Sequence, residues 1–298
     1  MFKSLIRTFA IVAAFIAGYM MPGLHVYSWT FNWMLVVMLF VTFLGIRFKR
    51  MKPERAHWLL TGANLMVALA AWGVCRLVFG DGYLAQAAFF VGIMPTATAA
   101  PVVMGLLGGS VEFMLTALLL INGIICALLP FILPAVVGRG GFEIYLNVAQ
   151  NISLVMLLPL ALALAARRFY PRAIAWPRKL KDVTFGIWVV ILVLIAANAS
   201  YDISSREGIS ERVLEQIGVI ALLVCGVNFG LGYLLGGHTR AAECSQALGQ
   251  KNTTLSIYLA LTYASPIAAL GPTFYVLWHN LWNAWQLYRA SERKRRDG

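Results

Sequence analysis

Two interrupted hydrophobic segments decide the fold of this chain: residues 83–107, YLAQAAFFVGIMPTATAAPVVMGLL, and residues 240–263, RAAECSQALGQKNTTLSIYLALTY. Each segment is long enough to cross a bilayer as a helix. Pro95 and Pro101 break the first segment, and the run from Gly249 to Asn252 breaks the second. In hydrocarbon, unwound backbone persists only where it lines a cavity or is packed within protein. Two such breaks at corresponding places in two halves of a membrane protein indicate the binding site of a transporter.

The composition predicts a multi-span membrane protein. Of the 298 residues, 60% are hydrophobic and 12% are charged, and the mean hydropathy is +0.77. Soluble proteins carry about 25% charged residues. The net charge of +12 does not indicate a nucleic-acid partner, because the basic residues lie in short loops between apolar segments, as orientation signals do. The lipid bilayer is the expected surrounding.

The sequence gives no indication of enzymatic chemistry. An intramembrane enzyme would need a nucleophile–base pair, a carboxylate pair or a metal cluster. HExxH and GxSxG motifs do not occur, and the four cysteines lie inside apolar segments without the spacing of metal ligands. We therefore expect neither an enzyme nor a protein with a metal centre or a cofactor.

Apolar runs of about 20 residues predict ten membrane spans. They are 4–22, 29–46, 58–79, 83–107, 111–137, 144–166, 183–200, 213–236, 240–263 and 267–289. With both termini in the cytoplasm, all but five of the 24 Lys and Arg residues fall on the cytoplasmic side or its margin; the five are Arg76, Arg139, Arg206, Arg212 and Lys251. This bias supports both the span count and the orientation. The short basic loops fit a bacterial inner (plasma) membrane.

The spans divide into two halves of five, residues 1–138 and 143–298. An odd number of spans in each half makes the second half insert upside down, so the two halves are predicted to be inverted repeats. The interrupted segment is fourth in each half, and breaks at equivalent positions of inverted repeats meet near the bilayer midplane. The predicted fold is therefore an all-α membrane protein with ten helices, of which the fourth and ninth are broken and cross.

In the first break, Pro95 and Pro101 remove N–H donors. The second half-helix is expected to start near Thr98, so that its free N–H groups and positive dipole end point at the cavity. Thr98 would cap this half-helix or touch a ligand. A proline-kinked packing helix is the alternative interpretation.

In the second break, Gly249 permits unwinding, and Asn252 and Thr253 suit the N-cap of the half-helix that follows. Lys251 is the most unusual residue of the chain, because a lysine at mid-span costs roughly 2.5–3.5 kcal/mol and normally faces a partner or water. The alternative is that Lys251 extends to an interface. Glu243 is expected either to pair with Arg240 or to project inward. His279 is expected to be a helix–helix contact or a group that titrates near neutral pH.

The two breaks resemble those of the bile acid:sodium symporter family. That family carries Pro-Gly-Gly-Thr-Ala-Ser-Asn in its fourth span, which Pro95, Thr98 and Ala99 match here. Its ninth span carries Glu-x-Gly-x-Gln-Asn, which Gly249 and Asn252 match. The resemblance implies a panel of spans 1, 2, 6 and 7 and a core of spans 3–5 and 8–10.

The departures from the family concern sodium. The resemblance implies two sodium ions, held by the Ser and Asn of the first motif, by hydroxyls of the fifth span, and by the Glu and Gln of the second motif. The corresponding residues here are Ala100, Pro101, Met114, Leu118, Ala247 and Lys251. Sodium ions are therefore not expected. What survives is the pair that the resemblance places against the anionic group of the substrate, Thr98 and Asn252.

These arguments define a set of candidate residues. Substrate contacts are expected from Thr96, Thr98, Ala99, Asn252 and Thr253; charge and coupling from Lys251, Gln250, Gln246 and Glu243; and the shape of the breaks from Pro95, Pro101 and Gly249.

The predicted function is secondary transport of a small organic anion, a carboxylate, by alternating access. The ammonium of Lys251 would replace the sodium charge. Because a lysine buried away from water can lose its proton, transport would be proton-coupled through Lys251 or uncoupled. The alternatives are a sodium-coupled symporter with non-standard sodium sites and a sensor or channel built on a transporter fold. The sequence does not indicate the substrate, the direction of transport or the oligomeric state.

Overall fold

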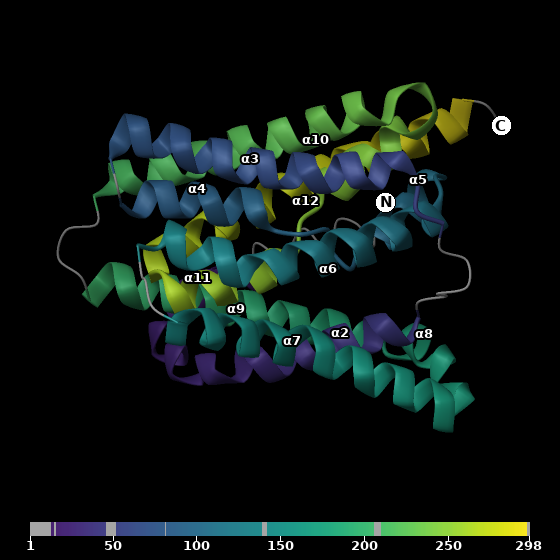
Figure 1. Ribbon diagram of the computed structural model, residues 1–298, viewed down its shortest axis with the longest axis horizontal. Coiled ribbons are helices and arrows are strands. Elements are labelled where there is room, and N and C mark those ends of the chain that lie inside the picture. The colour runs from purple at the N-terminus through teal and green to yellow at the C-terminus, as the bar shows by residue number, and fades with distance from the viewer. Residues whose placement is uncertain are drawn as a thin grey trace. The chain divides into compact units, whose positions relative to one another are not determined.

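The structure is a computed structural model that describes residues 13–14, 16–45, 52–80, 82–138, 142–205 and 210–296. Throughout these ranges the regular elements are helices (Figure 1). They are η1 (Pro22–Thr30), α2 (Phe31–Leu44), α3 (Arg55–Phe79), α4 (Tyr83–Ile93), α5 (Ala100–Leu107), α6 (Val111–Val136), α7 (Phe142–Phe169), η3 (Pro171–Ala175), α8 (Trp176–Lys179), α9 (Lys181–Ser205), α10 (Glu211–Gly249), α11 (Thr253–Tyr263) and α12 (Pro266–Arg296).

The helices have the length and composition of a membrane protein. In the described part of the chain, four helices are long and apolar enough to span a bilayer, or six if each of two bent pairs counts as one span. The predicted span 4–22 lies mostly outside the described residues. The stretch 167–182, predicted as a loop, contains two short helical elements, η3 and α8.

The chain divides into two compact units, each described by itself. One unit comprises 14–50 and 126–205, and the other comprises 1–13, 51–125 and 206–298. In the first unit, α2 packs beside α7, and α9 packs on η1. Within it, the Ser200 hydroxyl donates to the Tyr19 carbonyl over 2.9 Å.

The second unit holds both interrupted segments. Its helix α3 packs beside α4 and α10 (Figure 1). The contact of α3 with α4 is close: a Cβ at Gly92 would stand 2.5 Å from the Cα atom of Ala68. Glycine is therefore the residue that lets these two backbones approach.

Helix α10 reverses direction near its end. Gly237 has φ +55° and ψ −144°, which lies outside the helical region. A positive φ of this kind favours glycine. After this turn the chain runs back along the preceding part of α10, because the Ser245 hydroxyl donates to the Phe229 carbonyl over 2.8 Å. Gly232 makes the close approach possible, since a Cβ there would stand 2.4 Å from the Cys244 oxygen.

Both interrupted segments lose their helical backbone where the sequence predicts it. Helix α4 ends at Ile93 and α5 begins at Ala100. Helix α10 ends at Gly249 and α11 begins at Thr253. Pro101 is the second residue of α5, a first-turn position where its missing N–H costs nothing.

Candidate functional site at the paired helix breaks

The two breaks lie side by side and run antiparallel. Thr96 and Lys251 form an isolated β-bridge. On either side of it, the Ala97 N–H donates to the Gln250 carbonyl over 2.8 Å, and the Asn252 N–H donates to the Pro95 carbonyl over 2.8 Å. Segments about 150 positions apart in the sequence thus satisfy one another's unwound backbone.

The end of α4 is closed by side chains. The last four carbonyls of a helix have no partner within it. The Ile93 carbonyl accepts from the Asn64 amide over 3.1 Å. The Gly92 carbonyl accepts from Lys251 Nζ over 3.3 Å, and the Phe90 carbonyl accepts from the Ser256 hydroxyl over 2.7 Å.

The end of α10 is closed in the same way. The Ala247 carbonyl accepts from the Thr96 hydroxyl over 2.7 Å. The Gly249 carbonyl accepts from the Tyr275 hydroxyl, also over 2.7 Å. The Thr96 carbonyl in turn accepts from the Asn122 amide over 2.9 Å. Thr96 is fully buried and ties the two breaks together through both its backbone and its side chain.

Lys251 lies inside the same unit and not at an interface. Lys251 is 1% exposed, and its ammonium donates to Asn64 Oδ1 as well as to the Gly92 carbonyl. The alternative that Lys251 extends to an interface is therefore wrong. Both accepting oxygens are neutral, and no carboxylate in the described part of the chain pairs with the ammonium. The negative end of the α4 dipole, at Gly92, is the charge complement that the fold supplies.

The N-terminus of α11 is capped by Asn252, as the sequence predicts. Its Oδ1 accepts from the Leu255 N–H over 3.4 Å. Its Nδ2 has no partner among the described residues, although the residue is 9% exposed. The next residue, Thr253, is 5% exposed. A buried amide group with a free donor thus stands at the positive end of a half-helix.

The N-terminus of α5 differs from the prediction. The N-cap residue is Ala99, without a side-chain cap, so Thr98 does not cap this half-helix. The cause is that the backbone pairing holds Ala97 to Gln250, which delays the helix until Ala100. Thr98 is half-buried and Ala99 is exposed.

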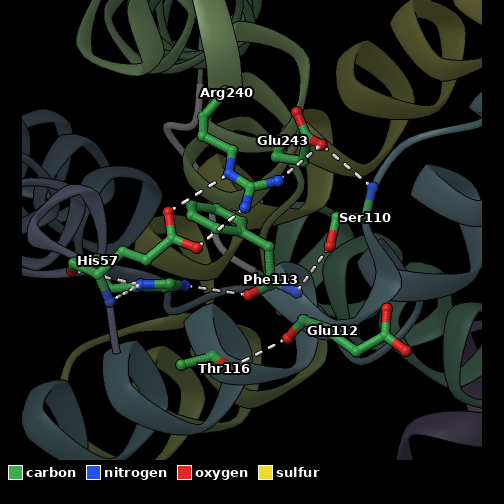
Figure 2. Close-up of polar contacts among 8 residues, drawn as sticks. His57, Ser110, Glu112, Phe113, Thr116, Arg240 and Glu243 are labelled. Atoms are coloured by element: carbon green, nitrogen blue, oxygen red, sulfur yellow. Dashed lines mark hydrogen bonds and ion pairs between the residues drawn. The ribbon is translucent and has the colours of Figure 1, made fainter. Parts of the chain in front are cut away.

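Glu243 lies in a separate polar cluster at the turn of α10 (Figure 2). Its Oε1 accepts from the Ser110 N–H over 3.1 Å and lies 3.7 Å from Arg240 Nη1. Arg240 also pairs with Glu54 at 2.9 Å and lies 5.1 Å above the Phe113 ring. Of the two alternatives for Glu243, pairing with Arg240 is the one observed. Glu243 is six residues before Gly249, about 9 Å along the helix, so it does not belong to the paired breaks.

Gln246 and Gln250 are both buried. Gln246 Nε2 donates to Asn283 Oδ1 over 3.0 Å and also to Gln286 Oε1, so this side chain contacts α12 and not the breaks. The Gln250 carbonyl joins the pairing with Ala97, while its side-chain Oε1 has no partner within the described ranges. Gly249 is packed against Phe229, whose ring carbons a Cβ would approach to 2.3 Å.

Four residues that contact the paired breaks were missed by the sequence argument: Asn64, Asn122, Ser256 and Tyr275. Asn64 is the polar residue in the middle of an apolar run, which is a signal of a buried polar partner. Tyr275 is one of several aromatic residues in α12, and no local pattern shows that its hydroxyl reaches Gly249.

A scan of the chain against protein-family models gives no match, and a search of curated proteins finds none either. The family resemblance therefore rests on the residues and placement of the two breaks.

Proposed function

We propose that this chain is a secondary active transporter of a small organic anion, a carboxylate, with the architecture of the bile acid:sodium symporter family. The antiparallel pairing of the two breaks at Thr96 and Lys251 carries the proposal. It joins two unwound segments from distant parts of the chain, and it places the start of α11 beside the end of α4 and the start of α5 beside the end of α10. A half-helix N-terminus at each of the paired breaks is suited to an anionic group.

The proposed architecture has ten spans in two inverted repeats, 1–138 and 143–298. Its panel would comprise spans 1, 2, 6 and 7, and its core spans 3–5 and 8–10. The division of the helices into two compact units supports this assignment in part: η1, α2, α7 and α9 fall in one unit and α3, α4, α5, α10, α11 and α12 in the other, while α6, the proposed fifth span, is divided between them. In alternating access, the core unit would move against the panel.

The proposed source of positive charge is Lys251. Its ammonium bonds to the Gly92 carbonyl, an oxygen at the end of α4 of the kind that a cation would otherwise coordinate. Met114, Leu118 and Ala247, which the resemblance aligns with sodium ligands, are buried and carry no side-chain oxygen. Transport would therefore be independent of sodium and either coupled to protons through Lys251 or uncoupled.

The test is uptake into proteoliposomes of a panel of radiolabelled anions: a keto acid, pantothenate, a bile acid and a sulfated steroid. Sodium is replaced by choline in one series, and an inward proton gradient is applied in another. We expect anion uptake above that of protein-free liposomes, and we expect the replacement of sodium by choline to leave this uptake unchanged. A sodium requirement would establish the alternative of a sodium-coupled symporter with non-standard sites. Binding without accumulation of any anion would favour a sensor or channel.

Two Lys251 variants separate the coupling mechanisms. Lys251→Ala removes the charge and is expected to abolish uptake or change its coupling. Lys251→Arg keeps the charge, and the arginine side chain stays protonated across the pH range of the assay. If the lysine is a proton carrier, the arginine variant loses its response to pH; if it is a fixed cation, the variant transports as the parent does. Unchanged uptake and pH response in Lys251→Ala would contradict the assignment of either role.

A further inference from the structure

One face of α12 carries a row of polar side chains. Tyr275, His279, Asn283 and Gln286 follow one another at intervals of four, four and three residues, which places them on one side of the helix. The Tyr275 and His279 rings are in contact edge to face, with centroids 5.5 Å apart. A row of this kind is uncommon in a helix bounded by apolar segments, and its buried members need partners.

The row begins at the second break and ends near the surface. At one end the Tyr275 hydroxyl donates to the Gly249 carbonyl, the last residue of α10, and accepts from Asn228 Nδ2 over 3.3 Å. At the other end the amides of Asn283 and Gln286 both accept from Gln246 Nε2. Gln286 is half-buried, whereas Tyr275 is fully buried. The row therefore leads from the paired breaks to the surface of this unit.

Several polar atoms along this row lack a partner among the described residues. They are Asn228 Oδ1, Gln246 Oε1, His279 Nδ1 and Asn283 Nδ2. All four residues are buried, with exposed fractions between 0% and 5%. A buried polar atom without a hydrogen bond is costly, so two such atoms in the row and two on the facing residues of α10 require an explanation.

The chemistry of the unpartnered atoms identifies what would satisfy them. Gln246 Oε1 and Asn228 Oδ1 accept hydrogen bonds, whereas Asn283 Nδ2 donates them. A cation would serve only the oxygens, and an anion only the amide N–H group. Water does both, and buried waters are found where two to four polar groups converge.

We propose that this face of α12 is lined by a chain of internal waters that connects the paired breaks with solvent at the Gln286 end. If the chain is the proton-coupled transporter proposed above, this path would let protons exchange between the region of Lys251 and the side that the charge pattern predicts to be cytoplasmic. The hydration of the row does not itself depend on transport.

The experiment is hydroxyl-radical labelling of the purified protein in water enriched in oxygen-18, read by mass spectrometry. Radicals formed from bound waters modify aromatic and histidine side chains next to them. Tyr275 and His279 are buried, yet we expect several-fold more modification there than at Phe89. Phe89 is the matched control, because it is a fully buried aromatic packed against Phe90.

A variant tests whether the waters belong to the row. Asn283→Leu removes the unpartnered donor and the contact with Gln246, and labelling of His279, one helical turn away, should fall to the level of Phe89. Modification of Tyr275 and His279 in the parent protein no higher than at Phe89 would overturn the proposal, because the row would then be dry. The parent comparison needs no variant to fold. It also needs no substrate, so a protein that transports nothing can still pass it, and an active transporter can still fail it.

Discussion

The hydroxyl of Thr96 gives the sharpest test of the paired breaks. It donates to the Ala247 carbonyl over 2.7 Å, and the residue is fully buried. Ala247 lies in the last turn of α10, so its carbonyl has no partner within the helix. Thr96→Val preserves the shape of the side chain but removes the donor. The Ala247 carbonyl then loses its side-chain donor in a buried site.

The expected loss follows from that single orphaned carbonyl. An unsatisfied buried acceptor costs about 1–3 kcal/mol. Chains of about 150–250 residues lose roughly 2–4 °C of Tm for each kcal/mol. We therefore expect Thr96→Val to lower the Tm by about 2–12 °C. The helices themselves remain, because no in-helix hydrogen bond is removed.

The assay uses the protein's own cysteines. All four are free and buried, so a thiol-reactive fluorogenic maleimide reports their exposure as the protein melts in detergent. Thr273→Val is the matched control: Thr273 is 8% exposed, and its hydroxyl donates to the Ala269 carbonyl, which the backbone of α12 already serves. The control should change stability by only about 0.5 kcal/mol. Equal melting temperatures for the two variants would refute the reasoning that Thr96 closes the end of α10.

Two further substitutions test the packing and the polar cluster with the same melting assay. Gly249→Ala puts a Cβ 2.3 Å from the Phe229 ring and should lower the Tm. The control Gly62→Ala meets open space in a helix and should raise the stability by about 0.5–1 kcal/mol. A higher Tm for Gly249→Ala than for Gly62→Ala would show that the Phe229 ring moves freely. Glu54→Gln removes the charge that pairs with Arg240; the side chains of Glu54 and Arg240 are 42% and 33% exposed. The variant should lose at most about 1 kcal/mol of stability, and 1 M salt should remove the difference from the parent. A larger loss that persists in salt would contradict a solvent-screened pair.

The places where helices break were predictable from single residues, but the way each break is stabilised was not. Proline and glycine act on their own backbone, so Pro95, Pro101 and Gly249 mark the ends of α4 and α10 locally. The donors that close those ends come from distant helices, and no local pattern specifies that Asn64 reaches Ile93 or that Tyr275 reaches Gly249. Such pairs become visible only when the helices are packed.

Thr98 shows how tertiary contacts override a local preference. A threonine after a break and before an apolar run is a favourable N-cap residue. In the structure the Ala97 N–H is held by Gln250, and the helix begins only after Ala99. Asn252 keeps its predicted cap, because its own backbone pairs with Pro95 one residue before α11 begins. The N-cap preference is therefore met at Asn252 and overridden at Thr98, because the backbone pairing ends at a different distance from the start of each half-helix.

Two differences from the resembled family meet at the second break: an alanine at position 247 and a lysine at position 251. In the resembled family, one glutamate and two sodium ions give the loaded site a net charge of +1. Here alanine stands at the glutamate position, 247, and a protonated Lys251 alone gives the same net charge without a bound ion. A lysine added beside a retained glutamate would form a neutral pair, and a glutamate lost without a new cation would leave nothing to attract an anion. If the chain is the anion transporter proposed above, the two differences are coherent only together, because the neutral oxygens around the ammonium would leave its charge available to a ligand.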